Sequence, residues 1–206
     1  MAKDLRPSAR MSRKLFLLSP ASTSGRRAQL LFNERAQFPL AQALHSGAGA
    51  SLGEVFSFLS GLYFRGKLGY ARTFAFNAED IRIITPDRGL LHPDTTITLD
   101  DLRAFSTSPI DVSNARYADP LMRDALALSK ADCAILLGSI ASNKYIDILL
   151  HIYDDRLLFP QEFIGRGDMS RGGLMLRCVD SNDELTYVPV SGAIRHGKRP
   201  PKLNPR

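Results

Sequence analysis

The chain has 206 residues but only two cysteines, Cys133 and Cys178, and no apolar run approaches the length of a membrane span. A spanning helix needs about 20 mainly apolar residues, and the run at 15–18 is too short even for the core of a signal peptide. Two cysteines in separate apolar segments provide neither a disulfide framework nor a zinc pattern. We therefore expect a cytoplasmic protein with no metal, no cofactor and no membrane partner.

The sequence also lacks the short motifs of common hydrolases. It contains no His-Glu-x-x-His, no Ser-His-Asp spacing, no Cys-x-x-Cys and no Gly-Lys-Ser/Thr after its first loop. These absences disfavour a zinc hydrolase, a nucleophilic hydrolase and a Walker-type phosphate loop. An enzyme of this sequence would use acid–base residues from separate loops. The candidates are Asp87, His92, Asp94, Asp168 and His196, of which we take Asp87, His92 and Asp168 as the predicted catalytic residues.

The formal net charge of +6 is concentrated at the two ends of the chain. Residues 1–14 contain five basic side chains against one acid, and residues 195–206 contain five basic side chains and no acid. Such proline-containing arms with little apolar content are expected to be mobile. They bind phosphate backbones by counterion release, or serve only as solubilising tails. We predict a basic arm at 1–14, one α/β domain at 15–194 and a basic tail at 195–206.

Apolar, strand-like runs alternate with segments of helical spacing. Strands are predicted at 14–19, 81–85, 132–138 and 156–159, and helices are predicted from Arg26, after Ser51, after Asp119 and from Lys144. Toward the C-terminus, the runs 174–179 and 184–190 flank a short polar turn and predict a β-hairpin. Strands that alternate with helices favour a mainly parallel sheet with helices on both faces. The predicted fold is therefore a three-layer α/β domain with a C-terminal β-hairpin.

Ligands of such sheets bind beyond the C-terminal ends of the strands. The loop 19–27 offers hydroxyls, guanidinium groups and a helix N-terminus that suit a phosphate, with Ser24 as the expected cap. The loop 165–173 combines four glycines with two arginines, as anion-binding nests do. Helix capping and a flexible hairpin entrance explain the same residues without a ligand. The predicted ligand-binding residues of the loops are Ser19, Ser22, Ser24, Arg26, Arg88, Ser139, Lys144, Arg166, Ser170 and Arg171.

The segment 61–70 interleaves aromatic residues with cations. Tyr63 and Lys67 are its candidate ligand-binding residues, because an aromatic ring stacks on a base while a neighbouring cation contacts phosphate. Aromatic residues at helical spacing also belong to ordinary cores. Both interpretations remain open at the level of the sequence.

Four segments of the sequence resemble segments of a known group of proteins. They are Leu17-Leu-Ser-Pro20, Leu62-Tyr-Phe-Arg-Gly-Lys67 with Tyr70-Ala71, Ile83-Ile-Thr-Pro-Asp-Arg-Gly-Leu-Leu-His-Pro-Asp94, and Leu137-Gly-Ser139 with Lys144-Tyr145. Across about 15–165 the chain resembles small α/β proteins related to the peroxide-stress protein YaaA and to the uracil-DNA-glycosylase-like domain of archaeosine synthase. The resemblance implies a nucleic-acid or nucleobase role, with Ser19, Tyr63, Lys67, Asp87, Lys144 and Arg166 around one cleft. The glycosylase motif Gly-Gln-Asp-Pro-Tyr and the His-Pro-Ser loop are missing.

Three hypotheses follow for the function. The first is a nucleic-acid- or nucleobase-binding protein of stress response, DNA repair or defence. The second is an enzyme that acts on a nucleotide or base by N-glycosidic or phosphoester cleavage. The third is a scaffolding subunit whose hairpin extends the sheet of a partner. The sequence does not indicate the oligomeric state.

Overall fold

The computed structural model describes residues 13–141, 143–194, 197–201 and 203, and shows an α/β fold. Most of the predicted arm (1–12) and half of the predicted tail (195–196, 202 and 204–206), including His196, lie outside these described residues. A six-stranded sheet runs in the order β4-β3-β1-β6-β7-β8. Its strands are β1 (Lys14–Leu18), β3 (Ile81–Ile84), β4 (Leu90–Leu91), β6 (Cys133–Leu137), β7 (Leu157–Pro160) and β8 (Tyr187–Pro189). The four central strands are parallel and both edge strands are antiparallel, so the predicted, mainly parallel sheet is confirmed.

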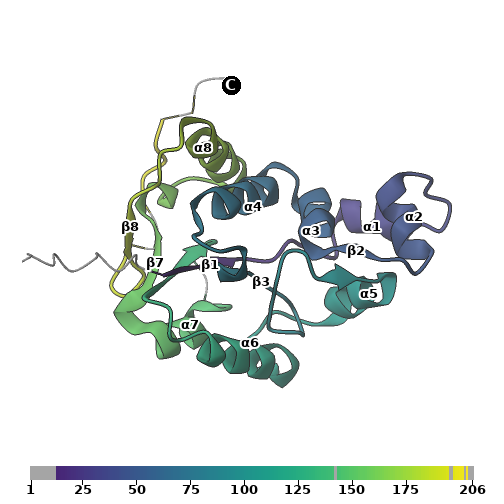
Figure 1. Cartoon of the computed structure of the whole chain (residues 1–206), viewed down its shortest axis with the longest axis horizontal. Helices are drawn as coiled ribbons and strands as arrows, with labels where there is room; N and C mark the ends of the chain where they lie inside the picture. Colours follow the sequence, from purple (N-terminus) through teal and green to yellow (C-terminus); the bar gives the residue numbers. More distant parts are fainter. Residues whose placement is uncertain (1–12, 142, 195–196, 202, 204–206) are drawn as a thin grey trace, which may run out of the picture.

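Helices cover both faces of this sheet, with α4 and α8 on one side and α6 and α7 on the other (Figure 1). The helices are α1 (Arg26–Phe32), α2 (Pro39–His45), α3 (Leu52–Ser60), α4 (Leu62–Phe74), α5 (Leu99–Thr107), α6 (Ala115–Ala127), α7 (Ile146–Tyr153) and α8 (Asp168–Ser181). A separate antiparallel pair joins β2 (Ala50–Ser51) to β5 (Thr96–Ile97). Along β1, Phe16 and Leu18 enter one hydrophobic core, and Leu15 and Leu17 enter the other. This alternation is what a strand buried on both faces requires.

Three central strands end at the same edge of the sheet. Leu18 of β1 is in register with Ile83 of β3 on one side and with Leu137 of β6 on the other. The chain passes from β1 to β3 and later crosses back to β6 on the opposite side of β1. The order of strands therefore reverses beside β1, and the chain leads from β1 to α4 on one face of the sheet and from β6 to α7 on the other. Open α/β sheets bind ligands at such a switch point.

The region 165–181 differs most from the predicted structure. The loop predicted at 165–173 continues from 168 into α8, and the strand predicted at 174–179 is part of the same helix. Helices α4 and α8 pack closely where Gly66 meets Gly172, because a Cβ on either residue would lie 2.7 Å from a backbone oxygen of the opposite helix. This tertiary packing outweighs the low intrinsic helix propensity of glycine. A C-terminal antiparallel strand pair is present, but it is formed by β7 and β8, which pair directly with each other and are separated in the sequence by α8.

Smaller differences concern where helices begin. Gly25, not Ser24, occupies the N-cap of α1, and no side chain caps that helix. Asn114 caps α6, so Pro120 lies inside the helix instead of at its first position. The helix predicted after Ser51 ends at Ser60, and α4 begins at Leu62 after the intervening Gly61. Each observed cap, Gly25 or Asn114, is itself a residue type that N-caps favour, so composition alone does not single out the cap position.

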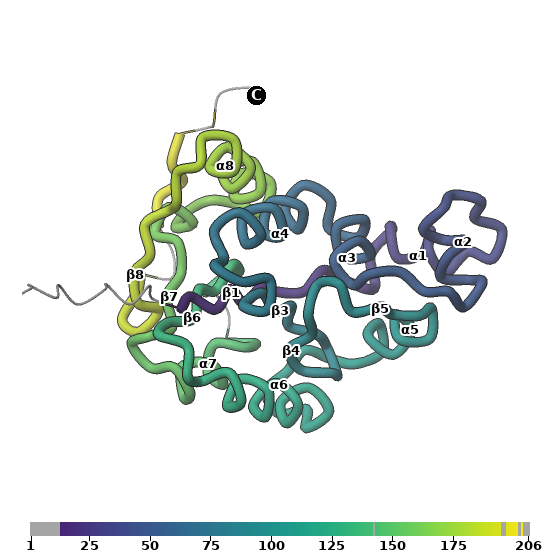
Figure 2. Tube along the Cα trace, viewed as in Figure 1, coloured from purple at the N-terminus to yellow at the C-terminus, as the bar shows by residue number. Residues whose placement is uncertain are grey.

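The C-terminal segment returns beside α8, as the yellow end of the trace in Figure 2 shows. The backbone oxygen of Lys198 lies against Gly165, and Leu203 lies against Gly173. Among the described residues, no helix has the length and apolar character that crossing a bilayer requires.

Candidate functional site

A cleft of about 770 Å³ lies at the edge where β1, β3 and β6 end. Its walls come from the loops after these strands, the junction of α3 and α4, the end of α5 with the segment after it, and the start of α8. The lining includes Ser19, Ser22, Ser24, Tyr63, Phe105, Ser139, Lys144, Tyr145 and Asp168. This volume falls in the range of about 300–1,000 Å³ that small-molecule sites occupy. The cleft therefore has the size and the topological position of a ligand site.

A buried lysine stands directly behind the wall of the cleft. Lys67 of α4 is 1% exposed, and its Nζ donates a hydrogen bond to the backbone oxygen of Ser19 at 2.5 Å. The same Nζ lies 3.0 Å from Ser19 Oγ and 4.5 Å from the centre of the Tyr63 ring. Burial lowers the pKa of Lys67 to about 7; Asp168 acts in the opposite direction, and Arg171 lowers this pKa further. A neutral amine is therefore well populated near neutral pH.

Ser19 connects this lysine to the cleft. The residue is 7% exposed and belongs to the lining. Gly138, which follows β6, fits tightly against it, because a Cβ there would lie 2.8 Å from Ser19 Cβ and 3.0 Å from the Tyr145 hydroxyl oxygen. The Tyr145 hydroxyl donates to the backbone oxygen of Ser139 at 2.8 Å, and burial raises the pKa of this phenol. The loops after β1 and β6 therefore meet in a packed polar junction.

Tyr63 contributes an unpartnered hydroxyl to the same wall. The residue is 6% exposed, and its hydroxyl oxygen is buried with no hydrogen-bond partner among the described residues. Burial raises the pKa of this phenol, and the nearby Arg171 side chain, whose contact with the hydroxyl falls short of hydrogen-bond geometry, only partly opposes the shift. The hydroxyl stays protonated, and leaving it unpaired costs about 1–3 kcal/mol. A ligand atom that accepts its proton would recover this energy.

Seven predicted residues gather in the cleft lining, namely Ser19, Ser22, Ser24, Tyr63, Ser139, Lys144 and Asp168. Lys67 stands behind Ser19, outside the lining. Arg171 is turned toward Phe163, whose backbone oxygen accepts from its Nη2 at 3.2 Å, and it lines a small adjoining cavity with Gly138. The predicted catalytic residue Asp168 is thus the acid at the rim of the cleft.

Three other predicted ligand-binding residues take structural contacts or lie outside the cleft lining. Arg166 donates to the Glu162 backbone oxygen at 3.0 Å and to Ser170 Oγ at 3.2 Å, so Arg166 and Ser170 hold together the turn that precedes α8. Arg26 is exposed at the start of α1 and is not part of the lining. The structure therefore does not bring Arg26, Arg88, Lys144, Arg166 and Arg171 into one cluster.

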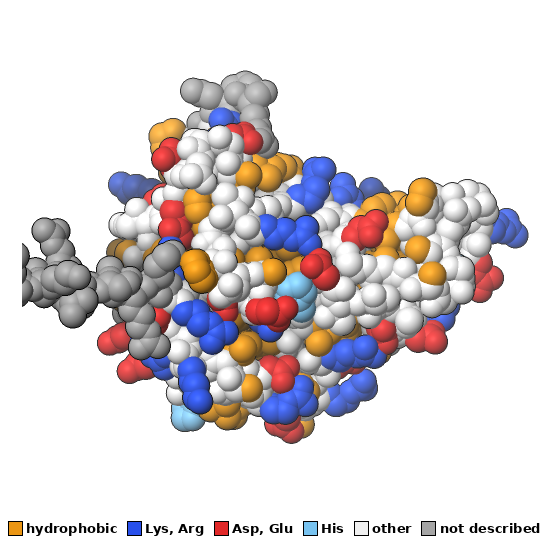
Figure 3. All heavy atoms as spheres, in the orientation of Figure 1, with side chains coloured by type: hydrophobic (Ala, Val, Ile, Leu, Met, Phe, Trp, Pro, Cys, Tyr) orange, Lys and Arg blue, Asp and Glu red, His pale blue; other side chains and the backbone are white. Residues whose placement is uncertain are grey.

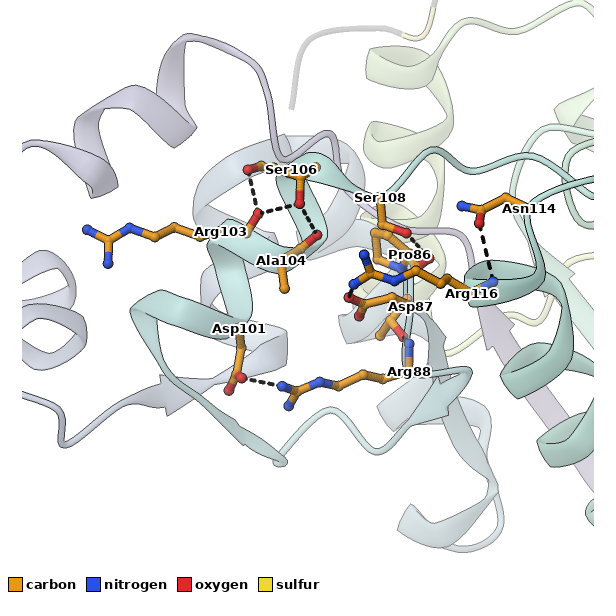
Figure 4. A network of polar contacts seen from close by, with 12 residues as sticks. Pro86, Asp87, Arg88, Asp101, Arg103, Ala104, Ser106, Ser108, Asn114 and Arg116 are labelled. Atoms are coloured by element: carbon orange, nitrogen blue, oxygen red, sulfur yellow. Dashed lines mark hydrogen bonds and ion pairs between the residues drawn. The ribbon is translucent and has the colours of Figure 1, made fainter.

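The predicted residues of the loop after β3 form ion pairs instead of facing the cleft. Asp87 pairs with Arg116 at 3.4 Å, and Arg88 pairs with Asp101 (Figure 4). His92 lies in the turn after β4, where its Nε2 is 3.1 Å from the Ala78 backbone oxygen. None of the three belongs to the lining, so two of the three predicted catalytic residues, Asp87 and His92, are placed elsewhere.

Sequence reasoning missed one wall of the cleft, the segment 105–110 that ends α5 and follows it. Ser108 Oγ donates to the Pro86 backbone oxygen at 3.0 Å and ties this segment to the loop after β3 (Figure 4). A signal was available, because the run Ser106-Thr-Ser-Pro109 has the same hydroxyl-rich character as Ser19-Pro-Ala-Ser-Thr-Ser24. Two such runs in one chain indicate two polar walls.

Comparison with known proteins found no matching family model, no matching curated protein and no matching solved structure. The fold and the cleft define an α/β protein with a polar site at its switch point. The resemblance to relatives of YaaA stays a prediction.

Proposed function

We propose that the cleft binds a nucleotide unit, either a free nucleotide or one presented by a single-stranded nucleic acid. The observation that carries this proposal is a cleft at the switch point of the sheet whose lining residue Tyr63 has a buried hydroxyl with no hydrogen-bond partner among the described residues. Native proteins rarely leave such a group unpaired. A ligand oxygen or ring nitrogen that accepts this hydrogen bond accounts for it.

The lining contains groups suited to each part of a nucleotide. Tyr63 and Tyr145 line the cleft with only 6% of each residue exposed, so a base would contact these rings over a small area. Lys144 is exposed at the mouth, where its ammonium group suits a phosphate, and Ser22 and Ser24 add hydroxyl donors. A phosphate is expected on the side of Lys144, because the carboxylate of Asp168 repels it. This carboxylate is better suited to accept a hydrogen bond from the amino group of a base.

The distribution of charge favours a nucleotide-sized ligand over a long duplex. On the face in Figure 3, the described Lys and Arg side chains are interspersed with Asp and Glu instead of forming a continuous basic band. Duplex binding by counterion release requires many unpaired cations along one track. The basic ends of the sequence, most of which lie outside the described residues, remain a predicted source of additional phosphate contacts. A role in stress response, repair or defence also remains a prediction.

Isothermal titration calorimetry with nucleoside monophosphates, the matching nucleosides, inorganic phosphate and a short single-stranded oligonucleotide tests the proposal. We expect nucleoside monophosphates to bind more tightly than either nucleosides or phosphate. Tyr63→Phe removes one hydrogen bond of about 0.5–1.5 kcal/mol, which weakens binding up to about tenfold. Lys144→Ala is expected to weaken the monophosphates but not the nucleosides.

Arg88→Ala is the matched control, because Arg88 follows a neighbouring strand but pairs with Asp101 outside the cleft. Its affinities should equal those of the wild type. Tighter binding of the oligonucleotide than of any mononucleotide would identify nucleic acid as the source of the ligand. The absence of heat with every nucleotide, or equal binding by all variants, would reject the proposal.

A further inference from the structure

Ser19 and Lys67 have the geometry of a hydroxyl next to its base. A neutral lysine amine has two N–H bonds and one lone pair. In the resting protein Nζ donates to the Ser19 backbone oxygen at 2.5 Å and to Ser19 Oγ at 3.0 Å; when the amine is neutral, its lone pair is within reach of the Ser19 hydroxyl hydrogen across the same 3.0 Å. The amino group also faces aromatic rings, with the Tyr63 and Phe64 centres at 4.5 and 4.7 Å. No carboxylate among the described residues forms an ion pair with this lysine.

We propose that Ser19 is a nucleophile for acyl transfer and that Lys67 is its general base, which gives the protein an activity toward activated carboxylic esters. Ser19 lines the cleft, whereas Lys67 lies behind it and is shielded from solvent. A nucleophile that lines the cleft, with a largely desolvated base directly behind it, is the arrangement that serine–lysine enzymes use. This activity goes beyond nucleotide binding and does not depend on it.

The reaction balances with these two residues and water. Neutral Lys67 takes the proton of Ser19 Oγ as Oγ bonds to the ester carbonyl carbon. The bond from carbon to the leaving oxygen then breaks, and that oxygen takes the proton from Lys67, which releases the alcohol and leaves an acyl group on Ser19. Water next gives a proton to Lys67 while its oxygen bonds to the carbonyl carbon. Ser19 Oγ departs with the proton of Lys67, and a carboxylic acid is released.

The groups around Lys67 set the pH at which this base works. Asp168 and Arg171 act on it from α8 with opposite signs, Asp168 favouring the ammonium form and Arg171 the amine. Tyr63 on its own helix and Tyr145 beside Ser19 are phenols whose pKa values burial raises, so neither adds a charge near neutral pH. Burial is the largest influence, and it lowers the pKa of Lys67 to about 7. The reactivity of Ser19 should rise with pH through this value.

Labelling with a fluorophosphonate ester tests the proposal, because the reaction forms an Oγ–P bond, releases fluoride and passes the hydroxyl proton to Lys67. Intact mass and peptide mapping should show one adduct on Ser19, formed at a rate that rises with a midpoint near pH 7. Ser19→Ala should remain unlabelled. Lys67→Met and Lys67→Arg should each react at least about a hundredfold more slowly, the loss expected when a general base is removed.

Ser129→Ala is the control, because Ser129 is half-buried, its hydroxyl donates to the Leu126 backbone oxygen and it does not line the cleft. It should label at the wild-type rate. If a Lys67 variant does not fold, the pH profile of the wild-type protein decides the question. An adduct on another residue, or labelling of Ser19 at a rate independent of pH, would overturn the proposal. Nucleotide calorimetry measures a separate property, so the two proposals can fail independently.

Discussion

Two loops at the same edge of the sheet begin with a hydroxyl residue followed by proline, Ser19-Pro20 after β1 and Thr85-Pro86 after β3. Thr85 Oγ1 donates to the Gly89 backbone oxygen at 2.9 Å and accepts from the Arg88 amide at 3.1 Å, so this hydroxyl closes its own turn. Ser19 Oγ instead lies 3.0 Å from Lys67 and lines the cleft. Similar dipeptides in equivalent positions therefore have different chemical uses.

The charged residues of the two regions differ in the same way. Arg88 is paired with Asp101, and Asp87 is paired with Arg116 through Oδ2, whereas the buried Oδ1 of Asp87 has no hydrogen-bond partner among the described residues. Lys67 has a buried amino group whose only hydrogen-bond acceptors among the described residues belong to Ser19. A strand end brings polar residues close to a ligand site, but only groups that the fold leaves unpaired are available to a ligand or a reaction.

The largest expected effect is the pH dependence of stability caused by Lys67. The pKa of Lys67 is about 7 in the folded protein against an ordinary value of 10.5, so the unfolded chain binds more protons between these two pH values. The free energy of unfolding therefore rises with pH across this window, by on the order of a few kcal/mol for such a shift. In Lys67→Met, this contribution should vanish.

Urea denaturation of both proteins from about pH 6 to about pH 10 measures this prediction, because groups common to both cancel in the difference. The difference between the free energies of unfolding should favour the Lys67→Met variant most at the acid end and narrow as pH rises. If the difference between the two free energies of unfolding stays constant with pH, Lys67 keeps its ordinary pKa in the folded protein. The contrast between an unpaired lysine beside the loop after β1 and the paired charges of the loop after β3 would then fail.

The strands and the position of the cleft could be predicted because they depend on local signals. Apolar runs such as 132–138 indicate buried strands, and the rule for parallel sheets places ligands at their C-terminal ends. The paired charges of the loop after β3 could not be predicted. Arg116 and Asp101 come from other helices, 29 and 13 residues away from Asp87 and Arg88, and only the tertiary fold shows that they meet.

Helix α8 was missed for a different physical reason. Four glycines at 165–173 lower the intrinsic helix propensity by about 1 kcal/mol each relative to alanine, which favours a loop. Glycine is required here because α4 and α8 approach closely at Gly66 and Gly172. Gly172, Met175 and Cys178 are buried at helical spacing, so counting glycine as a packing residue would have revealed the helix.

The next prediction concerns two tyrosines whose hydroxyls are both buried without a hydrogen-bond partner among the described residues, Tyr63 in the cleft and Tyr117 on α6. Removing either hydroxyl removes an unpaired polar group, so Tyr63→Phe and Tyr117→Phe should each raise the free energy of unfolding by about 1 kcal/mol. Only Tyr63→Phe should weaken nucleotide binding, because Tyr117 does not line the cleft. Thermal denaturation with and without nucleoside monophosphate measures both effects. Equal loss of binding in the two variants would show that packing, and not the cleft hydroxyl, controls affinity.

The smallest expected effect is that of Arg88→Gln in the loop after β3. Burial favours a higher pKa for Asp101, but hydrogen bonds from Thr98 and Arg88 outweigh it and hold this pKa below its ordinary value. The ion pair stabilises the folded state at pH values above the ordinary pKa of Asp101, and this stabilisation is lost as pH falls through the lowered pKa.

The Arg88 side chain is 45% exposed, so water and salt screen the pair, and the loss of the pair should cost less than about 0.5 kcal/mol at neutral pH. Because the Asp101 carboxylate also accepts the Thr98 amide at 2.8 Å, the start of α5 should stay intact. Urea denaturation at neutral and acidic pH measures this cost, and a loss above about 1 kcal/mol at neutral pH would show that this ion pair stabilises the fold more than an exposed pair does.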